Sequence, residues 1–257
     1  MLLVFISCGK FSDYNEKEKG LHYKLCSFED GDIGFRPSFY KVASVTIYSE
    51  NGLVYKNFKE QIIPARDKRL NKLFEHLAQG DSAMFKISPA TLQNMIGVES
   101  QYANDDAYYT AEVKVHEYLS SLPKGYDPEM QEQIVLKKYV EYHKIGKPKR
   151  GIYVEVLNEG SGKKVKRDKV VTIHYIGRFL NGLEFDNTYK SSSFTFTYGT
   201  PGQVIPGLDI ALKGMKAGEK AKIIIPSQLA FKEEGSSTGV VPPFTSVEFE
   251  LEIINVK

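Results

Sequence analysis

Apolar residues recur with two different periods along this chain. Apolar and polar residues alternate over residues 110–118, 171–175 and 246–256, which is typical of strands with one buried face. Helical spacing is limited to short stretches such as residues 208–215, which lie between strand patterns. Many strands with few helices predict the α+β class.

A longer helix is predicted near the middle of the chain. Asp127 and Pro128 are a favourable N-cap and first-turn pair. Apolar residues recur at helical spacing until Gly146, and residues 147–150 then form a basic connector, interpreted as solvated linker rather than as a binding surface. The helix should pack on one domain through an apolar stripe. The members of this stripe are Met130, Ile134, Val135, Tyr139 and Tyr142.

The segments on either side of this helix share short motifs in the same order, which indicates an internal repeat. Asn-Gly-Leu stands at 51–53 and again at 181–183. Gln-Ile-Ile-Pro at 61–64 matches Gln-Val-Ile-Pro at 203–206, and a helical pattern follows each of them. Chance similarity between two β-rich segments is the alternative interpretation.

The repeat predicts two domains of one fold. They are residues 21–122 and residues 151–257, joined by a linker helix and connector over residues 123–150. The first copy differs from the second at two functional positions. Lys56 stands where the second copy has Asp186, and Ala65 replaces Gly207. We therefore expect the first domain to be a non-catalytic scaffold or docking domain.

Four motifs in the second half identify a family. They are Asn-Gly-Leu-Glu-Phe-Asp (181–186), Gln-Val-Ile-Pro-Gly-Leu (203–208), Gly-Met-Lys-Ala-Gly-Glu (214–219) and Val-Val-Pro-Pro (240–243). Their order over residues 151–257 resembles the FKBP-type peptidyl-prolyl cis–trans isomerases. The resemblance implies that each half is a bent antiparallel sheet of five or six strands wrapped around one short helix.

The resemblance also places an apolar pocket in the second half. It implies that Tyr175, Phe185, Asp186, Ile205, Phe231 and Phe249 act on the twisting bond, and that Phe194, Val204, Leu208 and Val241 bind the substrate. Asp186 would lie beside the twisting carbonyl with Tyr175 as its hydrogen-bond partner. The backbone N–H of Ile205 would hold a substrate carbonyl.

Each assignment has a simpler competitor. Phe194 and Phe249 lie in alternating strand patterns and would by themselves be read as core. Asp186 follows an Asn-Gly turn and by itself would be read as a solvent-facing residue. The joint occurrence of these residues in the order of the family favours the pocket.

The chemistry of such a pocket requires no nucleophile, metal or cofactor. Rotation about an X–Pro bond has a barrier of roughly 18–20 kcal/mol, because amide resonance is lost at the twisted transition state. Water stabilises the polar planar ground state, so a dry aromatic pocket favours the less polar twisted form. The five histidines show no metal-ligand spacing.

The chain also departs from the family pattern. It has no tryptophan, so Leu208 stands where the family commonly has a tryptophan floor, and Phe231 lacks the hydroxyl of the tyrosine that is often found there. The charged residues 232–234 replace a glycine-containing turn, and an arginine often found after the Asp186 position is absent. We expect weaker binding of macrolide drugs and an altered catalytic efficiency.

Composition and charge exclude other classes of function. With 42% hydrophobic and 26% charged residues, the chain has the composition of a globular protein. A formal net charge of +2 gives no electrostatic reason to expect nucleic acid as a partner. The two cysteines, Cys8 and Cys26, imply no disulfide framework.

The N-terminal residues 1–8 are apolar and end in a small residue and Cys8, a pattern that resembles a bacterial lipoprotein signal. We expect Cys8 to be lipidated, the polar residues 9–20 to be a tether, and the protein to sit at the cell envelope facing the periplasm. The apolar run is too short to span a bilayer. An apolar N-terminus that frays or packs as a strand is the alternative.

Three functions are compatible with these observations. The first is a prolyl isomerase that acts on X–Pro bonds of exported proteins and binds proline-containing polypeptide clients. The second is a module that binds proline-containing segments without turnover. The third is a structural lipoprotein of an envelope machine. Asp186 with Tyr175 favours the first, because binding alone needs neither residue.

Overall fold

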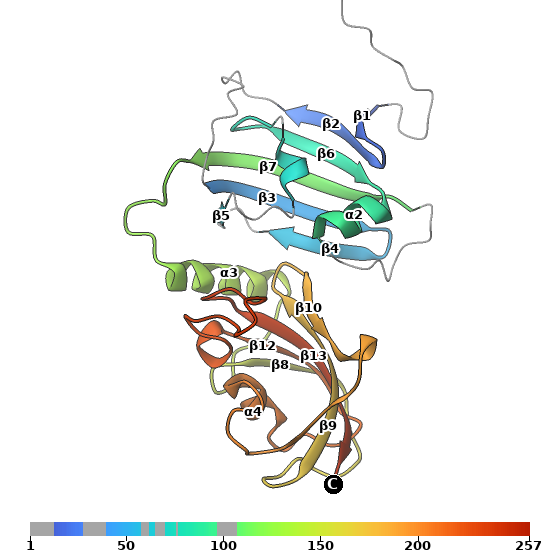
Figure 1. Cartoon of the computed structure of the whole chain (residues 1–257), viewed down its shortest axis with the longest axis vertical. Helices are drawn as coiled ribbons and strands as arrows, with labels where there is room; N and C mark the ends of the chain where they lie inside the picture. The colour runs from blue at the N-terminus through green and yellow to red at the C-terminus, as the bar shows by residue number, and fades with distance from the viewer. Residues whose placement is uncertain (1–12, 28–39, 58–61, 65–69, 76, 97–106) are drawn as a thin grey trace, which may run out of the picture. The chain divides into compact units, whose positions relative to one another are not determined.

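The computed structural model describes residues 13–27, 40–57, 62–64, 70–75, 77–96 and 107–257. The chain divides into two compact units, Met1–Tyr126 and Asp127–Lys257 (Figure 1). Each unit is an antiparallel sheet with few helices, so the predicted α+β class is confirmed.

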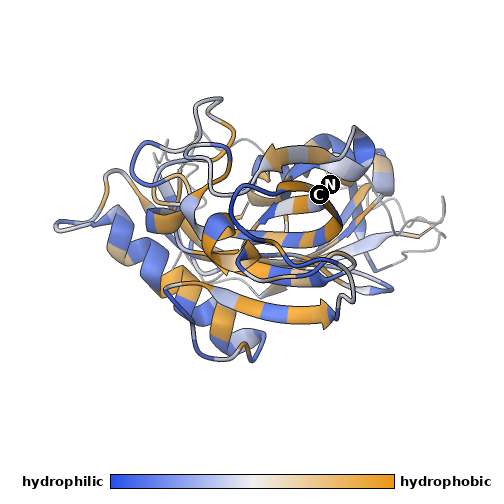
Figure 2. Cartoon of the chain, turned by 90° about the horizontal axis from the view of Figure 1, so that it is seen from below, coloured by the Kyte–Doolittle hydropathy of each residue, from blue (hydrophilic) through white to orange (hydrophobic). Residues whose placement is uncertain are grey.

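The second unit is built on a six-stranded sheet in the order β10-β9-β13-β12-β8, with β11 paired to β9. Every pairing in it is antiparallel. Alternating side chains give the sheet one apolar face, and Figure 2 shows the resulting bands along the strands. The strands are β8 (Tyr153–Asn158), β9 (Val170–Phe179), β10 (Glu184–Asn187), β11 (Phe194–Thr197), β12 (Lys220–Ile225) and β13 (Val247–Val256).

Helix α4 (Pro206–Leu212) packs on the apolar face of this sheet. Ile205 is its extended N-cap and Pro206 occupies the first turn, where a missing N–H costs nothing. A Cβ atom at Gly207 would lie 2.3 Å from Cγ2 of Ile225. Glycine therefore lets the first turn of the helix approach β12 closely.

Helix α3 (Pro128–Tyr142) belongs to the second unit. It begins as predicted, with the Asp127 side chain accepting a hydrogen bond from the Glu129 N–H at 2.9 Å. Its buried residues are Glu132, Leu136 and Tyr139. The predicted stripe was therefore right at Tyr139 and wrong at three other members. Its members Met130, Ile134 and Tyr142 are 59%, 36% and 48% exposed.

The polar residue Glu132 explains this error, because periodicity treats a glutamate as a solvent-facing position. In the structure its carboxylate is buried and hydrogen-bonded to Ser227 and Ser246. Hydrogen bonds of this kind allow a charged group to lie in an interior.

The first unit contains a seven-stranded sheet in the order β1-β2-β6-β7-β3-β4, with β5 paired to β3. Its short helices are α1 (Asn71–Phe74) and α2 (Pro89–Ile96). The strands are β1 (Asn15–Glu18), β2 (Leu21–Ser27), β3 (Tyr40–Ser49), β4 (Gly52–Asn57), β5 (Ile62–Pro64), β6 (Ser82–Ile87) and β7 (Tyr109–Leu119).

The two sheets have the same connectivity. The path β2-β6-β7-β3-β4 repeats the path β8-β12-β13-β9-β10 in chain order, and β5 pairs with β3 as β11 pairs with β9. Each sheet has one helix between the corresponding strands, α1 before β6 and α4 before β12. Strand β1 and helix α2 are additions of the first unit.

The matched Gln-x-Ile-Pro motifs have different local structures. Ile62–Pro64 forms strand β5, and helix α1 begins only at Asn71. In the second unit Pro206 is itself the first residue of helix α4. Ala65, which the sequence comparison set against Gly207, lies outside the described residues.

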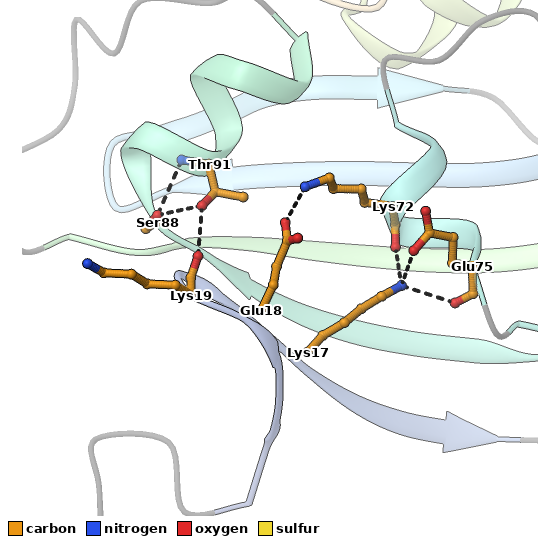
Figure 3. Close-up of polar contacts among 7 residues, drawn as sticks. All are labelled: Lys17, Glu18, Lys19, Lys72, Glu75, Ser88 and Thr91. Carbon is orange, nitrogen blue, oxygen red and sulfur yellow. Dashed lines mark hydrogen bonds and ion pairs between the residues drawn. The ribbon is translucent and has the colours of Figure 1, made fainter.

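Part of the predicted tether is ordered in the structure. Asn15–Glu18 forms strand β1, which pairs with β2. Figure 3 shows how it is fixed: Lys17 donates to the Lys72 carbonyl at 2.7 Å and pairs with Glu75 at 3.1 Å, and Glu18 pairs with Lys72 at 2.5 Å. Cys8 lies outside the described residues. No helix among the described parts of the chain is long and apolar enough to cross a membrane.

Candidate functional site

Three aromatic rings meet at edge-to-face angles on the apolar face of the second sheet. The buried Phe249 ring on β13 lies 5.5 Å from the Tyr175 ring on β9, at an interplanar angle of 70°. It lies 5.7 Å from the Phe185 ring on β10, at 88°. Such edge-to-face pairs are favourable because the positive ring edge meets the negative ring face. The buried Phe249 ring thus forms the surface against which the two half-buried rings pack.

Gly177 makes this arrangement possible. A Cβ atom at this position of β9 would lie 2.7 Å from Cε2 and Cζ of Phe185 and 3.3 Å from Cε1 of Phe249. Any side chain there would displace the Phe185 ring. Gly177 was not among the residues predicted from the sequence, although a glycine inside a strand pattern signals a close approach of another group.

A bulge in β10 directs Phe185 and Asp186. Glu184 pairs with Arg178 while Asp186 pairs with Gly177, so two steps on β10 oppose one step on β9. The extra residue is Phe185. Bulges of this kind reorient a side chain at the edge of a sheet.

Asp186 accepts a hydrogen bond from the Tyr175 hydroxyl, with 2.6 Å between Oη and Oδ2. This is the pairing that the family resemblance implies. Burial of the phenol raises the pKa of Tyr175, and the hydrogen bond and charge of Asp186 raise it further. The tyrosine is therefore a firmly protonated donor, and Asp186 is an exposed carboxylate beside the rings.

The aliphatic residues of the predicted pocket pack against the same core. Leu208 and Val241 are buried in this core at 5% and 2% exposure, and Val204 and Ile205 are half-buried against the core. Ile205 directly precedes helix α4. Among the described residues, no group accepts a hydrogen bond from the Ile205 N–H.

Two further aromatic residues of the predicted pocket are half-buried. Phe194 on β11 is half-buried and stacks on the buried Phe196 ring at 5.3 Å. Phe231 is also half-buried against the core. The structure thus gathers all ten predicted site residues in one unit, and it adds Gly177 and Phe179, whose ring lies 5.2 Å from Phe185.

The segment that joins β12 to β13 carries Phe231 and Val241. It is closed internally, because the Val241 N–H donates to Oγ of Ser236 at 2.8 Å and the Ser236 N–H donates to the Val241 carbonyl at 2.8 Å. Gly235 is in the left-handed region at φ +72°, and a Cβ there would lie 2.6 Å from the Val241 carbonyl oxygen. The charged residues 232–234 are exposed on this segment.

The chemistry available at this site is apolar binding with one carboxylate and one phenol. Within the described residues, no group of three or more histidine, cysteine, aspartate or glutamate side chains could hold a metal ion. The donors of the site are the Tyr175 hydroxyl and the Ile205 N–H. Such a set can bind and polarise an amide but offers no covalent chemistry.

This arrangement of sheet, helix and apolar site defines an FKBP-type isomerase domain. A family model for FKBP-type peptidyl-prolyl cis–trans isomerases matches residues 161–254. The FK506-binding protein of Neisseria meningitidis serogroup B is 40% identical over 107 residues, which cover 41% of this chain and 96% of that protein. The chain belongs to the family of FKBP-type peptidyl-prolyl cis–trans isomerases.

Longer relatives match as well. FKBP-type peptidyl-prolyl cis–trans isomerase FkpA of Buchnera aphidicola is 31% identical over 135 residues, or 52% of each chain. The crystal structure of FkpA from Escherichia coli is 30% identical with a TM-score of 0.45, over 51% of this chain and 60% of that one.

Proposed function

We propose that the second unit isomerises X–Pro bonds in the pocket that the ten site residues form. The substrate proline enters between Tyr175, Phe185 and the aliphatic residues, with Leu208 beneath it. The Ile205 N–H holds a substrate carbonyl, while the dry walls favour the twisted amide over the planar one. Every tenfold acceleration requires about 1.4 kcal/mol, so a few kcal/mol of such preference makes an effective enzyme.

The observation that carries this proposal is the Tyr175–Asp186 hydrogen bond at the rim of an otherwise aromatic cluster. A carboxylate beside the rings can interact with the carbonyl carbon as the amide loses resonance. Core packing alone gives no reason for an exposed carboxylate to be held there by a half-buried tyrosine.

The test is the rate of prolyl isomerisation in a short peptide and in a refolding protein. Phe185→Ala should lower kcat/KM at least about tenfold, because it removes one wall of the pocket. Tyr142→Ala, which truncates an exposed ring on α3, is the matched control and should leave kcat/KM unchanged. A folded wild-type chain that binds proline-containing peptides without accelerating either reaction would support the binding module instead.

The clients in this proposal are exported proteins, and the chain is held at the cell envelope by a lipid on Cys8, facing the periplasm. The support is the apolar N-terminal pattern that ends at Cys8. Residues 9–14 then separate the lipid from strand β1 and span at most about 20 Å. Mass spectrometry of the protein from bacterial membranes should find a diacylated N-terminus that Cys8→Ala abolishes; an unmodified N-terminus in the wild type would refute the anchor.

In the same proposal, the first unit is a degenerate copy of the isomerase fold. The turn that precedes β6 matches the turn that precedes β12, which supports this proposal. The Gly80 N–H donates to the Val115 carbonyl and the Asp81 N–H to the Ala78 carbonyl, as Gly218 does to Ile253 and Glu219 to Lys216. Gly80 and Gly218 share a left-handed φ of +91° and +84°.

The interior of the first unit supports a non-catalytic role. Lys41 is buried, with its ammonium 2.7 Å from Oδ1 of Asn71 and 4.4 Å from the centre of the Phe74 ring. A cation therefore lies beside helix α1, whereas the residues packed around α4 in the second unit are apolar. A buried cation at this place disfavours the binding of a twisted, weakly polar amide.

A further inference from the structure

A buried carboxylate connects helix α3 to the rest of the second unit. Glu132 is 8% exposed, and its Oε1 accepts a hydrogen bond from the Ser227 N–H at 2.6 Å. The same oxygen accepts from the Ser246 hydroxyl, and Oε2 accepts from the Ser227 hydroxyl. One side chain thus receives three charge-assisted hydrogen bonds, which are stronger than neutral ones.

The two serines are the two ends of one segment. Ser227 follows β12 and starts the single turn η2 (Ser227–Leu229), while Ser246 immediately precedes β13. Residues 228–245 between them carry Phe231 and Val241. Glu132 therefore binds both ends of this segment at once, and we call residues 228–245 the wall loop.

We call Ser227 and Ser246 the base of the wall loop. Other contacts also fix α3 beside this base. The Gln228 side chain donates to Glu129, one turn before Glu132. The Tyr139 hydroxyl donates to Glu248, which is buried two residues after Ser246. The helix is therefore held at three points along its length.

A hydrolytic role for this cluster is excluded by its burial. Ser227 and Ser246 are 1% and 4% exposed, so neither hydroxyl is open to a substrate. Both hydroxyls donate to the carboxylate and serve as fixed partners of it.

We propose that Glu132 is a positioning residue of the isomerase: helix α3 closes the base of the wall loop through Glu132 and thereby holds Phe231 and Val241 where the substrate proline binds. The proposal rests on the proposed function for the role of those two residues. A loop that is fixed before binding loses less conformational freedom when the substrate arrives. Because Phe231 is assigned to the twisting bond and Val241 to substrate binding, a loosened wall loop lowers kcat/KM, while Tyr175 and Asp186 on β9 and β10 keep their hydrogen bond.

The experiment compares the full chain with Glu132→Ala, Glu132→Gln and Glu141→Ala. Glu141 is the matched control, a carboxylate on the same helix whose side chain is 62% exposed. Glu132→Ala should lower kcat/KM for an X–Pro peptide about tenfold or more. Glu132→Gln, which can keep the three contacts through its amide, should recover most of this loss, and Glu141→Ala should behave as wild type.

Amide hydrogen exchange supplies a second measurement that does not depend on activity. In Glu132→Ala, exchange should accelerate in the wall loop while the central strands β9 and β13 keep their protection. If Glu132→Ala does not fold, Ser246→Ala removes one of the three hydrogen bonds and should show the same effects at smaller size.

Two results would overturn the proposal. Unchanged exchange in the wall loop would show that Glu132 does not hold it, and a loosened wall loop with an unchanged kcat/KM would show that it does not position the substrate. Failure of the site assignment is distinguishable, because Phe185→Ala would then keep full activity while the exchange result for Glu132 would stand by itself.

Discussion

At the scale of single residues, the site depends on small groups that make room for large ones. Phe185 is held by the edge of Phe249 and by the absence of a side chain at Gly177. Asp186 is held by the hydroxyl of Tyr175. The aromatic residues are prominent in the sequence, whereas Gly177 becomes significant only once β9 and β10 are paired.

Gly177→Ala should impair the site without unfolding the unit. The new methyl group would lie 2.7 Å from the Phe185 ring, which must move. We expect kcat/KM to fall about tenfold and the free energy of unfolding to fall by about 1–3 kcal/mol. Peptide isomerisation and urea unfolding measure these two effects.

The control for Gly177→Ala is Gly146→Ala, because a Cβ at Gly146 meets nothing within 4 Å. That variant should match the wild type in both measurements. Full activity in Gly177→Ala would mean that the position of the Phe185 ring does not matter for catalysis.

Tyr118 in β7 makes the first unit less stable as the pH becomes alkaline. Burial, and then the charge of Asp81, raise the pKa of Tyr118 from 10 to about 12. The unfolded tyrosine releases its proton first as the pH rises, so the contribution of Tyr118 to stability is constant below pH 10 and falls between pH 10 and about 12. Urea unfolding of the full chain should show this fall.

Tyr118→Phe should reduce the alkaline fall at the cost of stability at neutral pH, since it also removes the 2.9 Å hydrogen bond to the Leu77 carbonyl. The unfolding of the first unit is the transition to follow. An identical pH profile in wild type and variant would contradict the assignment of the fall to Tyr118.

At the scale of elements, helix α3 differs most from its expected role. Its start follows from Asp127 and Pro128, but its buried face does not follow from apolar spacing. A linker helix is expected to be dispensable for the domain that follows it. Helix α3 instead buries Leu136 and Tyr139, and its Glu132 binds Ser227 and Ser246 on either side of the wall loop.

Removal of α3 should therefore destabilise the isomerase domain. A fragment of residues 148–257 loses the buried Leu136 and Tyr139 contacts, and it leaves Ser227 without Glu132 and Glu248 without Tyr139. We expect its melting temperature to lie at least about 10 °C below that of a fragment of residues 127–257. Thermal unfolding, monitored by circular dichroism, measures both melting temperatures. Equal values would mean that α3 contributes nothing to the stability of the domain.

At the scale of the whole molecule, two units with one connectivity follow each other in the chain. The second unit carries the aromatic cluster with Tyr175 and Asp186. In the first unit, Lys56 stands at the position that the repeat sets against Asp186, and Lys41 is buried beside helix α1. Equal topology thus supports two different interiors.

When the two units are produced separately, only the second should have isomerase activity. Residues 127–257 should isomerise a short peptide with kcat/KM within about twofold of the full chain, because a tetrapeptide reaches only the pocket. Residues 13–126 should show no acceleration over the uncatalysed rate. Measurable catalysis by residues 13–126 would contradict a non-catalytic first unit.

The sequence by itself determined the α+β class and the family of the second half. It did so because strand alternation is local and because the motifs from Asn181 to Pro243 carry the family pattern. The same locality predicted the start of α3 at Asp127, where the N-cap and the first proline are adjacent in the chain.

Only the tertiary structure decided the buried face of α3, the role of Gly177 and the local structure of Ile62–Pro64. Each depends on groups that are distant in the chain. Glu132 can be buried because Ser227 and Ser246 donate hydrogen bonds to it. Gly177 is needed because β10 brings Phe185 across β9. Residue type and spacing do not encode such partners, since the energy of a buried polar group or a close contact is fixed only when the chain has folded.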